Sequence, residues 1–475
     1  MQPGAVSIIV TSISMNGSEM KKVLILTYYW APAGGSGVQR FLKFVKYLRA
    51  FGWEPVIYTA KDAEYPVLDP SMEKDVPDNL EVLRTKIREP YSFYKFFVGQ
   101  KQSEKMNPAF FTEKKKNTLA ENISVWIRGN FFIPDARMFW IKPSVKYLEK
   151  YLKENKVDAI ISTGPPHSVH RIALHLHRKL NIPWLADFRD PWTSIDFYHE
   201  LKLTKRADAK HHRMEAEVLR EADAVTVIGY TMGEEMKKLV NRNYDVITNG
   251  FDDEDAVVGL PAVVVLPTNN TADVGVVTNI PIQLDKKFSI AHIGTMVRAR
   301  NAPELWSALK DLLIEIPDLK NDLEIKLVGK VDLNVKNSLD ENGLTPFTNF
   351  VSYLQHDDVI KTQASSQVLL LMVNRTPTAK GIITGKVFEY LASGRPIVCI
   401  GPHDGDAARV LKEAQTGFMV GFDETEKMKT IIRDLYSQYK LGTLKATQGS
   451  IEKFSRKNLT RELAEVLNRI VKGQK

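Results

Sequence analysis

A lysine and a glutamate three residues apart carry the clearest chemistry in this sequence. Lys386 and Glu389 fall in a short expected helix, about 385–393, which follows a buried apolar run at 368–373 and a Gly-containing loop. Side chains at positions i and i+3 share one face of a helix, so the two project together. A helix N-terminus and a lysine attract a diphosphate, and a carboxylate accepts hydrogen bonds from ribose hydroxyls. The stretch suits a nucleoside diphosphate, although taken alone an exposed ion pair on a packed helix is the simpler interpretation.

A second candidate anion-binding loop stands near the start of the chain. It follows a buried strand expected at 23–27 and contains Gly34, Gly35 and Gly37 at the head of a helix. The loop is a poor match to a dinucleotide fingerprint, because Arg40 stands where the third glycine belongs and no acidic residue closes the next expected strand. This pattern argues against an NAD enzyme.

Polar side chains gather just beyond two further expected strands, 158–162 and 183–187. They are His167, His170, Asp187, Arg189 and Asp190. Open α/β sheets bind ligands at the carboxyl ends of their strands, so this cluster is a candidate catalytic site. Two simpler alternatives stay open. The histidines, despite a metal-ligand spacing, suit a capped helix start, and the segment 187–190 can form a structural ion pair beneath a loop.

The composition is that of a soluble globular protein. A chain of 475 residues exceeds one ordinary core, which predicts two or three domains. Its single cysteine, Cys399, allows no internal disulfide, and no stretch reaches the roughly 18 to 20 apolar residues of a membrane span. The net charge of +8 does not choose among nucleic acid, an anionic membrane and anionic substrates. Residues 1–19 lack the features of a signal peptide and are expected to be a tail or an upstream start, so we expect a cytoplasmic protein.

Alternating strands and helices divide the chain into two α/β domains. Residues 20–250 are expected to form a doubly wound, parallel, Rossmann-like domain and residues 287–450 a second one, joined by an extended linker at 251–286. A final helix within 451–475, with Ser455 as its cap, is expected to pack back toward the first domain.

Residues 88–150 break the strand–helix rhythm of the first domain and are rich in aromatic and basic side chains. We expect either a helical insertion with a solvated basic run or a patch that faces a membrane surface or an acceptor, for which rings and cations are suited. Stacking of single-stranded nucleic acid is the least supported alternative, because no nucleic-acid-binding motif surrounds the segment. We therefore expect no nucleic acid partner.

Two doubly wound domains facing across a cleft, with these motifs in this order, resemble the GT-B glycosyltransferases. The closer resemblance is to glycosyltransferase family 4 (group 1), whose members are retaining enzymes that use sugar nucleotides. It extends over about residues 20–472 and is carried by six segments: Gly34-Gly35 with Gly37, Thr163-Gly-Pro-Pro-His167, Leu185-Ala-Asp-Phe-Arg-Asp-Pro-Trp192, Ile247-Thr-Asn-Gly-Phe251, Ile293-Gly-Thr295 and Gly385-Lys-Val-Phe-Glu-Tyr-Leu-Ala-Ser-Gly394.

The resemblance implies a donor site built from both domains. Its expected donor-binding residues are Gly34, Gly35, Gly37, Thr295, Arg298, Arg300, Gly381, Ile382, Ile383, Lys386 and Glu389. Glu389 matches the glutamate that binds the nucleotide ribose in the family. Either Arg298 or Arg300 is expected to face the phosphates alongside Lys386.

The sequence departs from the family pattern at two of these positions. Gly381 stands where the family carries the first of two glutamates, which puts the contacts to the donor sugar in question. The main-chain N–H groups of residues 381–383 are the expected substitutes. Thr295 stands near the place of a family arginine, which is why one of the two later arginines is expected to supply that charge.

The catalytic residues implied by the resemblance come from the strand-end cluster and are Asp190, His167 and Arg189. Asp190 is the first choice to orient the acceptor or to steady the oxocarbenium-like sugar, and His167 is the second. Fixed cations and helix dipoles can stabilise the departing diphosphate, so no metal or other cofactor is expected. Asp404 and Asp406, just past a strand end, leave a divalent ion as an open alternative.

The implied function is retaining transfer of a hexosyl group from a nucleoside-diphosphate sugar to a glycan or lipid-linked acceptor, in the synthesis of surface polysaccharide or glycoconjugate. Such an enzyme is expected in the cytoplasm, and peripheral contact with the inner face of the membrane stays open. Two alternatives share the fold. One is a sugar-nucleotide 2-epimerase, and the other is a non-catalytic nucleotide-sugar or glycan-binding protein, to which the missing first glutamate points.

Overall fold

The computed structural model describes most of the chain: residues 20–65, 67–87, 119–196, 198–253, 283–352, 354–445 and 449–473. Residues 1–19, most of the expected linker and the first part of the 88–150 insertion lie outside the described residues. The expectations for those segments therefore stay predictions.

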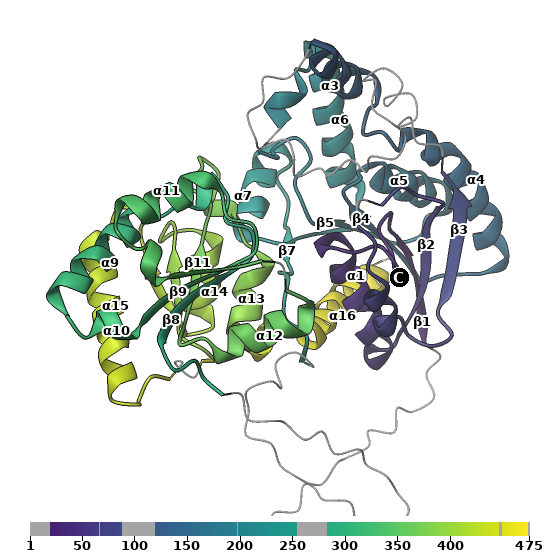
Figure 1. Cartoon of the computed structure of the whole chain (residues 1–475). Coiled ribbons are helices and arrows are strands. Elements are labelled where there is room, and N and C mark those ends of the chain that lie inside the picture. The colour runs from purple at the N-terminus through teal and green to yellow at the C-terminus, as the bar shows by residue number, and fades with distance from the viewer. Residues whose placement is uncertain are drawn as a thin grey trace, which may run out of the picture.

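The chain folds into two parallel α/β units (Figure 1), which confirms the predicted fold class. The first unit contains a seven-stranded sheet in the order β3-β2-β1-β4-β5-β6-β7. Its strands are β1 (Lys21–Leu26), β2 (Trp53–Lys61), β3 (Glu81–Lys86), β4 (Ala159–Gly164), β5 (Trp184–Phe188), β6 (Ala224–Val227) and β7 (Asp245–Val246). Residues 23–26 of β1 are all buried, as expected for a central parallel strand with both faces covered.

Helices cover both faces of the first sheet. One face carries α1 (Ser36–Leu48), and the other carries α4 (Met138–Glu154), α5 (Ser168–Leu180) and α6 (Lys205–Glu221). The unit also contains α3 (Leu119–Phe131), α7 (Tyr230–Leu239) and the short helices η1 (Arg49–Phe51), η2 (Pro70–Asp75) and η4 (Tyr198–Leu201). Because β1, β4 and β5 are parallel neighbours, the turns that follow them meet at one edge of the sheet.

The second unit contains a six-stranded parallel sheet in the order β10-β9-β8-β11-β12-β13. Its strands are β8 (Phe288–Ile293), β9 (Leu323–Val328), β10 (Thr348–Val351), β11 (Val368–Met372), β12 (Ile397–Ile400) and β13 (Phe418–Val420). One face packs against α9 (Pro303–Glu315), α10 (Leu319–Asp322), α11 (Leu333–Glu341) and α15 (Thr425–Lys440). The other face packs against α12 (His356–Ser365), α13 (Gly385–Ala392) and α14 (Asp406–Glu413). The short helices are η5 (Arg298–Arg300), η6 (Thr345–Phe347), η7 (Ala379–Gly381) and η8 (Glu452–Phe454).

The last helix, α16 (Arg456–Lys472), belongs to the core of the first unit. Ser455 caps it by accepting a hydrogen bond from the N–H of Asn458 at 3.2 Å. Its side chains Leu463 and Leu467 are fully buried in the same apolar cluster as those of α1, beside which it lies in Figure 1. In the described part of the chain, none of the helices has the length and apolar character needed to cross a membrane.

A carboxylate from the second unit caps a helix of the first. Asp406, at the start of α14, accepts hydrogen bonds from the main-chain N–H of Thr231 at 3.1 Å and from its hydroxyl at 2.9 Å. The guanidinium group of Arg409 lies 3.3 Å from the ring centroid of Tyr230, and the hydroxyl of that tyrosine donates to Glu413 at 3.2 Å. These contacts hold the N-terminus of α7 against α14.

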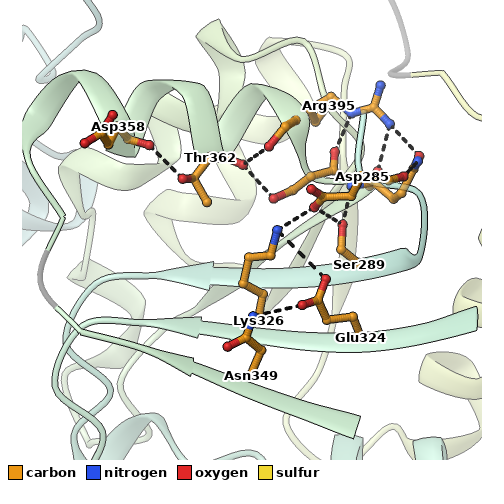
Figure 2. A network of polar contacts seen from close by, with 11 residues as sticks. Asp285, Ser289, Glu324, Lys326, Asn349, Asp358, Thr362 and Arg395 are labelled. Carbon is orange, nitrogen blue, oxygen red and sulfur yellow. Dashed lines mark hydrogen bonds and ion pairs between the residues drawn. The ribbon is translucent and has the colours of Figure 1, made fainter. Parts of the chain in front are cut away.

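A network of paired polar groups closes the amino edge of the second sheet (Figure 2). Lys326 of β9 donates to Asp285 at 2.6 Å, and the same carboxylate oxygen accepts from Ser289 at 2.6 Å. Arg395, just before β12, donates to the main-chain carbonyls of Ser366 and Gln367 at 2.7 and 3.1 Å. The network ties the entry of β8 to its neighbours, away from the strand ends that point toward the first unit.

Candidate functional site

A lysine lies over a glycine at the carboxyl edge of the second sheet. Gly294, directly after β8, has a φ of 137°, and a Cβ there would stand 2.1 Å from Cε of Lys386. Only glycine fits both this backbone conformation and the space, and it allows the side chain of Lys386 to cross the turn. Within the described residues Lys386 has no ion pair, so its ammonium group can meet a ligand.

Arg300 brings a second cation to the same edge. Its Nε donates to Oδ1 of Asn374 at 2.7 Å, and its Nη1 donates to the carbonyl of Thr295 at 2.8 Å. No described carboxylate pairs with this arginine, and burial lowers the pKa of its guanidinium group. The alternative cation, Arg298, is exposed to solvent. The geometry therefore favours Arg300 as the companion of the lysine.

A buried histidine lies within reach of both charges and stays neutral. Nδ1 of His292 lies 3.0 Å from the carbonyl of Leu370. Burial lowers the pKa of His292 to about 4, and the charges of Lys386 and Arg300 act in the same direction. This edge thus holds two cations without described carboxylate partners, an arrangement that suits a diphosphate.

Glu389 stands one turn further along α13. Its Oε2 accepts a hydrogen bond from Nε2 of Gln363 at 3.0 Å, and the residue is exposed. The ion pair with Lys386 that offered the simpler interpretation is not formed in the described structure. The carboxylate lines a cavity of about 130 Å³ between the two units, together with residues that include Gln39 and Lys43 of α1 and Arg456 of α16.

The loop before α13 corrects one expectation. Gly381 ends η7 and lies against α7, where its Cβ would stand 3.3 Å from Cγ2 of Thr231. The N–H groups of Gly381 and Ile382 already donate to carbonyls of the preceding turn. The expectation that residues 381–383 all offer N–H groups to the sugar is therefore wrong for the first two. Among the described groups, only the N–H of Ile383 in this set has no partner.

The three glycines of the first loop serve different purposes. Gly34 is hydrogen-bonded to the segment 67–69 and packed against it, so it closes the loop. Gly35 has a φ of 91° and begins α1. Gly37 leaves room for the guanidinium group of Arg189, whose Nη1 donates to its carbonyl at 2.9 Å. The N-terminal turn of α1 is thus the part of this loop that can approach an anion.

Two aspartates three residues apart have opposite surroundings. Asp187 is fully buried, pairs with Arg40 at 2.8 Å and accepts hydrogen bonds from two threonine hydroxyls. It forms the structural ion pair that the sequence left open as an alternative. The side chain of Asp190 is 43% exposed, and its polar partner among the described residues is Arg189 at 3.4 Å. Asp190 is therefore the carboxylate of this segment that can reach a substrate.

His167 lies beside this segment at the same edge. Its ring is parallel to that of Trp192, with centroids 4.6 Å apart. Burial lowers the pKa of His167 well below its usual value, and the nearby charge of Arg189 contributes in the same direction. The first unit thus brings together a helix N-terminus, a neutral histidine and an exposed carboxylate.

The two aspartates of the divalent-ion alternative have protein partners. Asp404 pairs with Lys380 at 2.5 Å, and Asp406 caps α7. In the part of the chain that the structure describes, no three His, Cys, Asp or Glu side chains are grouped to hold a metal ion.

Sequence reasoning missed two amides that are hydrogen-bonded to charged residues of the candidate site. Gln363 supports Glu389, and Asn374 supports Arg300. Asn374 directly follows the apolar run 368–373, so its place at a strand end was a usable signal. Gln363 gave none, because only the packing of α12 against α13 brings it to the carboxylate.

Two family models match the chain, one in each half. Residues 102–255 match the model described as Glycosyltransferase Family 4, and residues 287–438 match the model described as Glycosyl transferases group 1. A sequence comparison with curated proteins gives no match.

Solved structures of similar fold cover nearly the whole chain. TarM has a TM-score of 0.56 and 12% identity, with 94% of this chain and 99% of that chain covered. The lipopolysaccharide outer core galactosyltransferase WaaB has a TM-score of 0.52 and 11% identity, with 96% and 100% covered. A Listeria monocytogenes chain described as a candidate UDP-N-acetylglucosamine 2-epimerase has a TM-score of 0.50 and 10% identity, with 96% and 98% covered. Transferases and an epimerase thus share this fold.

Proposed function

This chain belongs to the GT-B glycosyltransferases of the family 4 and group 1 type, and from this premise we propose that it moves a sugar from a nucleoside diphosphate to a glycan or lipid-linked acceptor. The observation that carries the proposal is the pair of cations, Lys386 and Arg300, which no carboxylate among the described residues neutralises. A diphosphate supplies the opposite charge. A complex of S. aureus TarM with UDP, fondaparinux and α-GlcNAc-glycerol supports this class of donor and acceptor.

Departure of the diphosphate is the step that these cations assist. Breaking the bond to the anomeric carbon leaves negative charge on the phosphate oxygens. Lys386, Arg300 and the N-terminus of α13 stabilise that charge, and so does the N-terminal turn of α1 from the other unit. These groups can act without a metal ion. Glu389 has an oxygen without a described partner and accepts hydrogen bonds from the ribose hydroxyls.

The first unit is proposed to bind and orient the acceptor. We assign to Asp190 the role of orienting the acceptor hydroxyl beside the departing phosphate, which gives transfer with retention. The exposed carboxylate can also steady positive charge that develops on the sugar ring. Arg189 holds this segment against the glycine loop through the carbonyl of Gly37.

A thermal-shift screen of nucleoside diphosphates and sugar nucleotides tests the donor class. Binding to the native state stabilises it by RT ln(1 + [L]/Kd), about 2.7 kcal/mol at a hundredfold excess over Kd. We expect one sugar nucleotide to raise the Tm of the wild type, and Lys386→Gln to lose most of that shift. A wild-type protein whose Tm no such ligand changes would contradict the proposal. Conversion of the bound donor to its 2-epimer without any acceptor would replace it with the epimerase alternative.

We further propose that α3 rests on an anionic membrane surface when the acceptor is lipid-linked. Four large apolar side chains, spaced i, i+3, i+4 and i+8 along α3, are exposed: Ile123, Trp126, Ile127 and Phe131. Exposed cations accompany them on α3 and at the start of the adjacent α6: Arg128, Lys205 and Arg206. Apolar side chains beside cations suit the boundary between headgroups and acyl chains.

Sedimentation with lipid vesicles tests this surface. The wild type is expected to bind vesicles that contain phosphatidylglycerol more than vesicles of phosphatidylcholine alone. The double change Trp126→Ser and Phe131→Ser should reduce binding, whereas Ile314→Ser with Leu441→Ser, two exposed apolar residues of the second unit, should not. Equal binding by both double variants would remove α3 from the membrane contact.

A further inference from the structure

Two buried histidines point unpartnered nitrogens toward one small space. Nδ1 of His167 and Nε2 of His170 are both buried and make no hydrogen bond in the described structure. A Cβ at Gly164 would stand 2.5 Å from Nε2 of His170 and 3.2 Å from Nδ1 of His167. The two ring nitrogens therefore approach the same point beside Gly164, and a side chain larger than that of glycine would clash with His170 there.

Aromatic neighbours fix the planes of both rings. His167 is parallel to Trp192, and His170 lies on Phe188 with centroids 4.5 Å and planes 22° apart. Both partners come from the segment 185–192, so two of the sequence motifs interlock here. The rings are therefore held in place, and the position of each proton decides what the nitrogens can do.

A serine behind His170 sets its tautomer. Oγ of Ser162 accepts a hydrogen bond from Nε1 of Trp184 at 2.8 Å and lies 2.8 Å from Nδ1 of His170. The hydroxyl proton of Ser162 has no other described acceptor, so it is directed at Nδ1, which accepts it. A neutral imidazole carries one N–H, and that of His170 is then on Nε2, facing Gly164. Burial lowers the pKa of His170 to about 3, so the ring is neutral at physiological pH.

We infer that His170 is a positioning residue that donates to Nδ1 of His167, directly or through one water molecule beside Gly164, and so keeps the proton of His167 on Nε2. In the direct route Nδ1 of His167 is the acceptor. In the water route the water accepts from His170 and donates one of its own protons to Nδ1 of His167, so both routes give the same tautomer. His167 keeps 8% of its surface exposed, and its buried unpartnered nitrogen is Nδ1, so Nε2 is the nitrogen that can meet a ligand. His167 thus offers a neutral N–H donor, not a base, to an oxygen of the sugar or the acceptor.

What His167 touches rests on the proposed function, whereas its tautomer is a property of the free protein. Long-range proton–nitrogen NMR of the full chain labelled on histidine nitrogen distinguishes the two tautomers without any substrate. The resonances are assigned from His167→Asn and His170→Asn. We expect the wild type to show both rings protonated on Nε2. A proton on Nδ1 of His167 would overturn the inference, even in a protein that transfers sugar.

A serine substitution tests the chain of hydrogen bonds without altering either histidine. Ser162→Ala removes the group that holds Nδ1 of His170, so both rings should show mixed tautomers and kcat should fall about tenfold with little change in KM. Ser144→Ala is the matched control, because it removes another fully buried hydroxyl in the same unit, one that donates to the carbonyl of Trp140 at 2.6 Å. Unchanged tautomers in Ser162→Ala would contradict the inference, as would equal loss of activity in the control.

Discussion

The two edges of the second sheet treat their charged groups in opposite ways. At the amino edge, Lys326 is paired with Asp285, and Arg395 donates to main-chain carbonyls (Figure 2). At the carboxyl edge, Lys386 and Arg300 approach one turn without a described carboxylate partner. Partly buried cations without a carboxylate partner lower the free energy of unfolding. The arrangement at the carboxyl edge is therefore explained by an anionic ligand that pairs with these two cations. The amino edge stabilises the fold, and the carboxyl edge holds the cations that we propose bind the diphosphate.

Replacing one lysine at each edge by glutamine is the strongest test of this contrast. Lys386→Gln should lower kcat/KM by about 10²–10³, the usual cost of removing one stabilising group from a site where charge develops, with little loss of stability. Lys326→Gln should lower the free energy of unfolding by about 1–3 kcal/mol, because it leaves the carboxylate of Asp285 without its cation, and should keep the activity. Steady-state kinetics and urea unfolding of both variants measure the two effects. Similar results for the two lysines would end the contrast.

The same contrast recurs between Asp187 and Asp190. Asp190→Asn should keep donor binding but lower the rate of transfer by about a hundredfold, since its carboxylate is proposed to face the acceptor. Asp187→Asn should destabilise the first unit by about 3–5 kcal/mol, because it leaves the buried guanidinium group of Arg40 without its partner. Calorimetric donor binding, transfer assays and thermal unfolding separate the outcomes. Loss of donor binding in Asp190→Asn would move this residue out of the acceptor role.

Substitution of the two candidate arginines tests which of them binds the donor at the carboxyl edge. Arg300→Met should weaken donor binding about ten- to a hundredfold, because a charge-assisted contact to phosphate is lost. Arg298→Met should change it less than about threefold, as expected for an exposed charge screened by solvent. Calorimetry with the donor identified by thermal shift measures both. A larger effect at Arg298 would reverse the assignment.

The smallest effect concerns a second paired region, where Asp252 meets α1. Burial raises the pKa of Asp252, but hydrogen bonds from Lys43 and Tyr47 outweigh it and hold the pKa at about 2. Because the folded pKa lies below the unfolded value, the carboxylate stabilises the fold above about pH 4, and that stability is lost as the pH falls toward about 2. Urea unfolding at about pH 6 and about pH 3 should show a larger loss for the wild type than for Asp252→Asn. Equal losses would place the acid sensitivity elsewhere.

Local patterns predicted most of the scaffold. Apolar runs and glycine turns predicted both sheets, and the short helix expected at about 385–393 is α13 (Gly385–Ala392). The cap at Ser455 is also as predicted. β3 and α15 were not predicted, since β3 reads as an exposed, charged segment and α15 has no motif beside it.

The roles within the candidate site depended on partners far along the chain. Nothing near Asp187 distinguishes it from Asp190, because its cation, Arg40, is 147 residues away. Two further contacts are also visible only in the folded structure. Gly34 packs against the segment 67–69, and the N–H groups of residues 381 and 382 are hydrogen-bonded within their own turn. The sequence thus indicated where candidate site residues lie, but it did not indicate which of their polar groups are already paired within the protein.

The position of α16 has a consequence for the order of folding. Its apolar side chains pack in the same core as those of α1. In addition, Nζ of Lys21 in the first strand donates a hydrogen bond to Oδ1 of Asn468 at 2.7 Å, although the two residues are 447 positions apart in the sequence. During synthesis, the first unit therefore leaves the ribosome with an uncovered apolar stripe along α1, and this core is completed only when α16 emerges. A chain released after about residue 450 should expose that stripe and bind chaperones, even though every residue of the first sheet is present. The core of the first unit is thus completed only after the second unit has been made.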